Sequence, residues 1–181
     1  MNLTIKSLSP LLLLLLLSAC QNDLSEVDKI IPRTDVFVET AHDVRLLYSD
    51  SAIVKVQVEG AKMVRFLDKE DPRDEFPEGI AVSFFGGRDK VNSTLTAKFA
   101  VRYEGKKQIT VRDSVVWISK QGEKLESEEL IWDEENERVY SNRYVRITNA
   151  KEVIYGYGFE ANQDFTEWRI KQVEGRMGVE E

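Results

Sequence analysis

Hydrophobic and polar residues alternate along most of the chain beyond Thr34. In the segment 52–59, valines occupy every second position from Val54 and are separated by Lys55 and Gln57. A period of two is typical of antiparallel strands that bury one face and expose the other. The pattern therefore predicts strands, each with one apolar face.

The same period recurs in the segments 80–85, 93–104 and 153–161. The pairs Asp-Pro, Gly-Gly, Glu-Gly and Gln-Gly interrupt these runs and mark turns. The acidic segment 123–130 contains helix formers and continues the period of two poorly, but we find no convincing helix of ten residues and interpret it as a further strand. The sequence predicts roughly ten strands joined by hairpins, which is typical of an all-β sandwich or roll.

The net charge and the length of the chain limit the functions that it can have. The chain has 181 residues and a formal net charge of −7. An acidic balance argues against nucleic-acid binding, which requires clustered lysine and arginine. The length is enough for one domain with a sizeable core.

The first twenty residues differ from the rest. Lys6 precedes seven leucines at 11–17, and small residues lead to Cys20, the only cysteine. The apolar run is too short to span a bilayer, so it indicates a signal peptide. The segment 17–20, Leu-Ser-Ala-Cys, resembles a bacterial lipobox, which predicts cleavage before Cys20 and acylation of that residue, for example by palmitate. The alternative is an ordinary secreted protein with a chance cysteine.

We therefore expect three regions. Residues 1–19 are a lipoprotein signal peptide, 20–33 a lipidated tether, and 34–178 a β-domain. Two or more acyl chains hold a protein stably at a membrane, whereas one does so only marginally.

The residues suggest no catalytic centre. The single histidine, His42, stands beside Asp43 and is interpreted as an exposed loop residue. The acidic segment 133–137 lacks the spacing of a calcium loop. We expect no enzyme activity, no metal site and no cofactor.

An ordered series of short segments resembles the LptC family of the lipopolysaccharide export machine. The series covers residues 38–175 and consists of 44–51 running into 53–56, Asp71-Pro72, 75–80, 93–97, 122–125, 128–133 and 158–162. The resemblance implies an antiparallel β-jellyroll with two facing sheets and an open edge. It also implies a periplasmic protein that is not an enzyme. Many members hold the membrane by a helix, whereas this chain has the lipobox-like segment.

The resemblance further implies a relay. The protein would accept lipopolysaccharide from the inner-membrane ABC transporter, through the jellyroll of its membrane subunit, and pass it to an LptA-like bridge protein. The apolar faces of the expected strands suit such a cargo, because they can cover acyl chains while sugars stay in water. The candidate groove residues are Val54, Val56, Ile80, Val82, Phe84, Leu95, Phe99, Val101, Val115, Trp117, Val145, Ile147, Tyr157 and Phe159.

The resemblance also implies partner strands at both edges of the domain. They would lie near 43–48 and 165–172, with candidate contacts at Val44, Leu46, Tyr48, Trp168 and Ile170. Exposed strand edges can bind another strand by main-chain hydrogen bonds.

Two alternatives remain open. One is an outer-membrane lipoprotein with a structural or adhesive β-sandwich and no lipid cargo. The other is a carrier that shelters the lipid of client lipoproteins. The resemblance favours a lipid-anchored position at the periplasmic side of the inner membrane.

Overall fold

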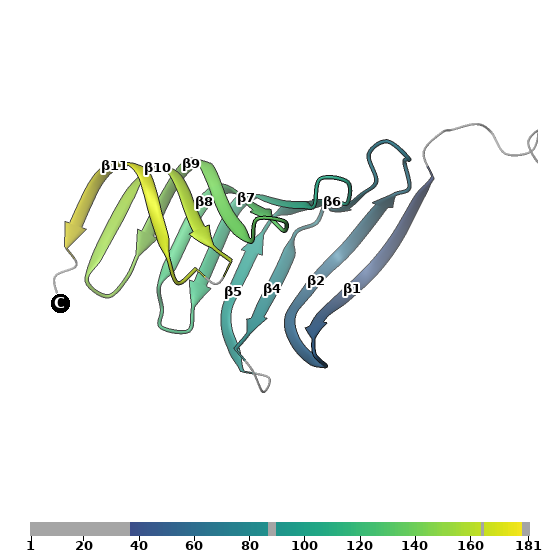
Figure 1. Cartoon of the computed structure of the whole chain (residues 1–181), viewed down its shortest axis with the longest axis horizontal. Helices are drawn as coiled ribbons and strands as arrows, with labels where there is room; N and C mark the ends of the chain where they lie inside the picture. Colours follow the sequence, from purple (N-terminus) through teal and green to yellow (C-terminus); the bar gives the residue numbers. More distant parts are fainter. Residues whose placement is uncertain (1–36, 87–89, 164, 179–181) are drawn as a thin grey trace, which may run out of the picture. The chain divides into compact units, whose positions relative to one another are not determined.

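Antiparallel strands make up the framework of the domain, and no helix occurs in the described residues 37–86, 90–163 and 165–178 (Figure 1). This computed structural model confirms the predicted all-β class, including a strand in the acidic segment that begins near residue 123. The strands are β1 (Val38–Asp50), β2 (Ile53–Phe66), β3 (Arg73–Phe76), β4 (Ile80–Phe85), β5 (Val91–Ala97), β6 (Phe99–Tyr103), β7 (Gln108–Ser119), β8 (Lys124–Asp133), β9 (Arg138–Thr148), β10 (Glu152–Asn162) and β11 (Trp168–Gly178).

Six of the strands form a closed ring, in which each strand pairs with two of the others. β2 pairs with both β3 and β4, β7 pairs with both β5 and β6, and the links β4–β5 and β3–β6 complete the circuit. β1 is added to β2, whereas β8, β9, β10 and β11 follow β7 one after another. The domain therefore has a closed middle and two extensions.

The long strands belong to two half-sheets. β2 pairs with β3 through 64–66 and with β4 through 56–59. β7 pairs with β6 through 108–112 and with β5 through 116–119. We call the half that contains β3 and β6 the upper half-sheet, and the half that contains β4 and β5 the lower half-sheet. Their apolar faces pack against each other, which gives the β-jellyroll that the family resemblance implied.

Local irregularities mark the boundary between the half-sheets. Asp113 and Ser114 in β7 have φ values of 66° and 59°, and the pairing of β7 with β8 shifts there. Gly158 in β10 has φ 72°, and the pairing of β10 with β9 shifts beside it. Left-handed residues of this kind bend a strand and increase its twist. They allow one strand to run from one half-sheet into the other.

Gly79 is required where the chain passes from β3 to β4. Its φ is 89°, and a Cβ atom there would lie 2.7 Å from the carbonyl oxygen of Ala97. Lys98 connects β5 to β6 at the same level, and its backbone N–H donates to the Asp113 carbonyl at 3.0 Å. The short strands thus change half-sheets at the level where β7 bends.

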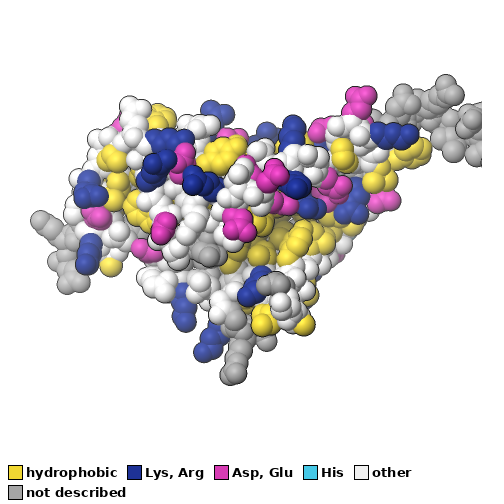
Figure 2. All heavy atoms as spheres, viewed as in Figure 1, with side chains coloured by type: hydrophobic (Ala, Val, Ile, Leu, Met, Phe, Trp, Pro, Cys, Tyr) yellow, Lys and Arg dark blue, Asp and Glu magenta, His cyan; other side chains and the backbone are white. Residues whose placement is uncertain are grey.

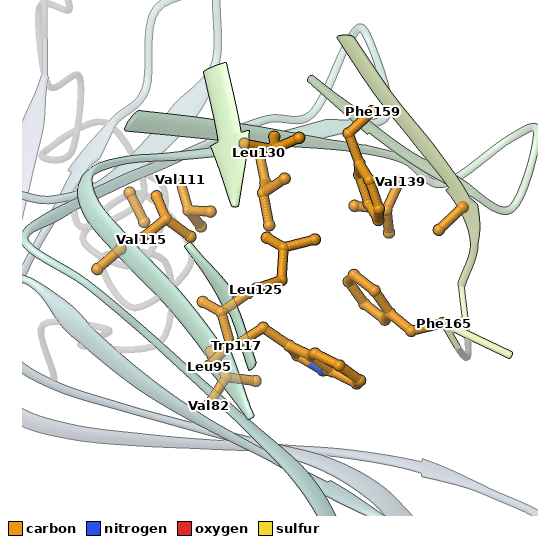
Figure 3. Close-up of a cluster of buried hydrophobic side chains, with 14 of the residues drawn as sticks. Val82, Leu95, Val111, Val115, Trp117, Leu125, Leu130, Val139, Phe159 and Phe165 are labelled. Atoms are coloured by element: carbon orange, nitrogen blue, oxygen red, sulfur yellow. The ribbon is translucent and has the colours of Figure 1, made fainter. Parts of the chain in front are cut away.

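The apolar core lies between the half-sheets (Figure 3). Val82, Leu95 and Trp117 come from the lower half-sheet, whereas Leu130 and Phe159 come from the upper half-sheet. All five side chains are buried. At about 1.5–3 kcal/mol for each fully buried large side chain, this packing is the main favourable contribution to folding.

The predicted regions 1–19 and 20–33 lie outside the described residues, and so does Cys20. The described part begins at Phe37, inside the expected β-domain, and belongs to the compact unit Val36–Glu181.

Candidate functional site

The apolar interior is less covered near the N-terminal strands than elsewhere. Six partly buried side chains from β1, β2 and β4 pack against the core, namely Val44, Leu46, Val56, Val58, Met63 and Phe84. In Figure 2, hydrophobic side chains gather in a hollow over β2 and β4, below a band of charged side chains. We call this part of the interior the apolar trough.

The interior is closed on the C-terminal side by Phe165. This residue lies in the turn between β10 and β11, and its ring is inserted between Trp117 and Phe159 (Figure 3). The centroid of the Phe165 ring lies 4.5 Å from that of Trp117 and 6.2 Å from that of Phe159. The crevice that remains, bordered also by Leu125 and Trp168, has a volume of about 10 Å³, which is at the lower limit for holding one water molecule.

Most predicted groove residues do face this interior. Eight of them are buried in the core, and two are partly buried beside it in the apolar trough. The buried ones are Ile80, Val82, Leu95, Val115, Trp117, Val145, Ile147 and Phe159, and the partly buried ones are Val56 and Phe84. Val54 is half-buried near the start of β2 but is not part of this cluster.

The prediction that Phe99 faces the interior is wrong, whereas Val101 is buried, at 4% exposed, without belonging to the main core cluster. The alternation of 93–104 is not continuous, because the chain breaks at Lys98 and resumes shifted by one residue. Ala100, only 2% exposed, is the core residue of β6. Phe99 lies on the opposite face, where the guanidinium carbon of Arg112 is 4.1 Å from its ring centroid.

Tyr157 is also on the other face. Its side chain is 47% exposed and forms an edge-to-face contact with Tyr144, with ring centroids 5.4 Å apart. The left-handed Gly158 follows it and changes the alternation, so that Phe159 points inward while Tyr157 points outward. The period of two in 153–161 therefore holds only on either side of this glycine.

The two predicted edges are free of neighbouring strands within the described residues. β1 pairs only with β2, and β11 pairs only with β10. Leu46 and Ile170 pack against the core from these edges, whereas Tyr48 and Trp168 are 43% and 37% exposed. The apolar interior thus lies between two strands that can each accept a further strand.

A comparison with protein families matches residues 8–177 to the family described as "Lipopolysaccharide-assembly, LptC-related". The chain belongs to the LptC-related family. A search of curated proteins gave no match.

Membership of the LptC-related family gives the coarse function. The family has a role in lipopolysaccharide transport, and it is a periplasmic family associated with the inner membrane. It is a transport component and not an enzyme family. The described residues include no helix with the length and hydrophobicity that a membrane span requires.

Ion pairs lie beside β3 and β6 in this LptC-related domain. Asp74 is 5% exposed and accepts hydrogen bonds from Arg65 at 2.7 and 3.3 Å. Arg102 donates to Glu134 at 3.1 Å. The Asp74 hydrogen bond raises the pKa of Arg65, and the Glu134 hydrogen bond raises that of Arg102. These arginines are largely neutralised by their carboxylate partners.

A second hollow, of about 690 Å³, is too rich in charged side chains to suit acyl chains. It lies where β2 leaves β4, over Gly60 and Gly79, and charged residues such as Arg45, Glu59 and Lys98 surround it. Arg45 and Glu59 form an ion pair there at 2.8 Å. An apolar ligand would leave these charges without water.

Among the described residues, no group of three or more His, Cys, Asp or Glu side chains is placed to hold a metal ion. His42 lies exposed in β1, not in a loop as the sequence suggested. The described side chains thus give no cluster from which a cofactor or metal role can be argued.

Sequence reasoning missed Phe165 as an interior residue. The expected edge strand 165–172 includes Phe165, but β11 begins only at Trp168. A turn residue has no alternating neighbours, so periodicity cannot assign it to a face. The only sequence signal is a large aromatic residue in a polar turn.

Proposed function

We propose that this protein relays lipopolysaccharide from the inner-membrane ABC transporter to an LptA-like bridge protein. The transporter's jellyroll would contact the β1 edge, and the bridge protein would contact the β11 edge. Acyl chains would enter the apolar trough and move along the interior. The carboxylate-rich exterior and the sugars would remain in water.

One observation carries this proposal: a continuous apolar interior that is partly uncovered at β1, β2 and β4 and lies between two free strand edges. A monomeric sandwich without cargo would be expected to cover this face. Strand addition at each edge would extend the interior into the next jellyroll.

The experiment uses two neighbouring leucines of β1. A photo-crosslinking amino acid is placed at Leu46, which packs against the core, or at Leu47, which is 56% exposed. Because successive residues of a strand point to opposite faces, only position 46 should capture lipopolysaccharide in cells. Equal capture at both positions, or none at 46, would contradict the relay and favour a sandwich without cargo.

The anchor is a second part of the proposal. Cys20 would carry the lipid, after removal of 1–19, and 20–33 would tether the domain. Replacing Cys20 with Ala should release the protein from the membrane fraction. Unchanged retention of that variant, together with no acyl mass on the wild-type chain, would refute the anchor.

A further inference from the structure

The turns at the outer ends of the two half-sheets form two separate groups. The turns β1–β2, β4–β5, β7–β8 and β9–β10 end the lower half-sheet, and we call them the lower turns. They lie at one end of the domain, because neighbouring strands pair beside them (Figure 1). The backbone N–H of Lys120 in the β7–β8 turn also donates to the Asn92 carbonyl in β5 at 2.8 Å. The turns β2–β3, β6–β7, β8–β9 and β10–β11 end the upper half-sheet and are called the upper turns.

Lysines predominate in the lower turns. Lys90, Lys120 and Lys151 are exposed there, and none of them forms an ion pair with another described residue. Among the described residues of these turns the only carboxylate is that of Glu123, which is half-buried. The lower turns are therefore locally positive in a chain whose formal net charge is −7.

Exposed apolar side chains accompany these lysines. Ile53, Val91 and Ile118 lie beside lower turns and are 47%, 44% and 41% exposed. Val91 directly follows Lys90, and Ile118 pairs with Lys124. In Figure 2, hydrophobic and basic side chains occur together along the lower edge of the view. Exposed apolar groups flanked by basic residues are typical of a surface that binds a lipid bilayer.

The opposite end of the domain has the opposite charge. Phe37 and Leu67 are exposed there as well. The upper turns, however, are rich in carboxylates, as in 68–71 (Asp-Lys-Glu-Asp) and 134–137 (Glu-Glu-Asn-Glu). An anionic surface repels such carboxylates and attracts lysines. Charge therefore distinguishes the two ends, and only the lower turns suit an anionic membrane.

We propose that the lower turns bind the surface of an anionic phospholipid bilayer. The three exposed lysines lie among the lipid phosphates, and the exposed apolar side chains enter the boundary between headgroups and acyl chains. The family is periplasmic and associated with the inner membrane, so a bilayer surface is close to the domain. This contact is separate from the lipid anchor, the apolar interior and both strand edges, and it does not depend on the proposed relay.

The test measures which end of the domain approaches lipid. Full-length protein is reconstituted into nanodiscs that contain a nitroxide-labelled lipid, with a fluorescent amino acid at Gln121 in a lower turn or at Gly105 in an upper turn. Both positions are exposed, and a Cβ atom at Gly105 would meet no atom within 4 Å. In nanodiscs that contain phosphatidylglycerol, the nitroxide should quench position 121 several-fold more than position 105.

Loss of charge on either partner should remove this difference. Nanodiscs of phosphatidylcholine alone carry no net charge, and in them position 121 should be quenched no more than position 105. At about fivefold for each lysine near an anionic surface, Lys90→Glu combined with Lys120→Glu should lower the ratio of bound to free domain more than tenfold. Lys106→Glu combined with Lys107→Glu, in an upper turn, is the matched control and should leave quenching at 121 unchanged.

A second pair of variants tests the apolar contribution. Ile118→Ser should reduce quenching at position 121 several-fold in the anionic nanodiscs. Leu67→Ser, which shortens a similarly exposed side chain in an upper turn, should not. Both side chains are exposed, so both variants should remain folded, and thermal unfolding followed by circular dichroism checks this.

The outcomes decide the proposal. Equal quenching at 121 and 105, stronger quenching at 105, or none at either position overturns it, because the lower turns would then not face the bilayer. Quenching at 121 that persists in phosphatidylcholine alone, or that the two lysine pairs reduce equally, overturns it as well. Quenching at 121 that depends on phosphatidylglycerol, on Lys90 with Lys120 and on Ile118 supports it.

Discussion

Single residues decide which face of a strand is apolar in this domain. At Lys98 and at Gly158 the chain shifts by one position, and every following side chain changes face. A shift of one residue has this effect because the side-chain period of a strand is two. Two neighbouring residues in β6 therefore have opposite environments.

Substitution of those neighbours should have opposite results. Ala100→Asp places a carboxylate in the core and should lower the free energy of unfolding by about 3 kcal/mol or more. Phe99→Asp should cost only ~1 kcal/mol, because the new carboxylate lies beside Arg112. Urea unfolding of both variants measures the difference. A larger loss for Phe99→Asp would mean that the face assignment of β6 is wrong.

Protonation of Glu160 makes the stability of the domain depend on pH. Hydrogen bonds from Lys171 and then from Arg169 lower the pKa of Glu160 from 4.5 to about 2. Because the folded-state pKa is depressed, the stabilisation is complete above pH 4.5 and is lost as the pH falls from there toward 2.

The expected consequence is a weaker β10–β11 pair in acid. Wild-type and Glu160→Gln proteins should approach each other in melting temperature between pH 4.5 and 2, and differ by a constant amount above that range. Thermal unfolding followed by circular dichroism tests this. A constant difference down to pH 2 would exclude the contribution of Glu160.

At the scale of elements, the sequence predicted the strands well and their faces only in part. Alternation identified Ile80 and Val82 as core positions of β4, because regular strands repeat every two residues. It could not locate the shifts at Lys98 and Gly158, since these depend on how a strand bends between half-sheets. It also missed Phe165, whose burial results from contacts between the turn and a distant strand.

The edge strands are the elements on which the proposed relay depends. Proline at Ile170 in β11 removes a backbone donor and cannot belong to a paired ladder. We expect Ile170→Pro to weaken capture of the LptA-like protein at least tenfold, while capture of lipopolysaccharide at Leu46 in β1 persists. Pull-down from cells measures both.

A proline in the opposite edge is the matched control. Arg45→Pro in β1 should disturb contact with the transporter and leave the bridge protein bound. If folded Ile170→Pro protein captures the bridge protein as well as the wild type does, β11 is not that edge.

At the scale of the whole described domain, the closed ring of β2, β4, β5, β7, β6 and β3 should be its most stable part. Its strands have neighbours on two sides, whereas β1 and β11 have one each. Amide hydrogen exchange should be slowest in β5 and β7 and fastest at the outer edges of β1 and β11. Uniform protection across all strands would contradict this ranking.

The same pairings have a mechanical consequence. Val38 begins β1 opposite Phe66, at the end remote from the β1–β2 turn, and Gly178 ends β11 opposite Glu152, remote from the β10–β11 turn. A force applied to these two ends would break hydrogen bonds one pair at a time, like a zipper, and would not shear a whole strand at once. In single-molecule stretching, both terminal strands should therefore peel off at low force, well before the ring ruptures.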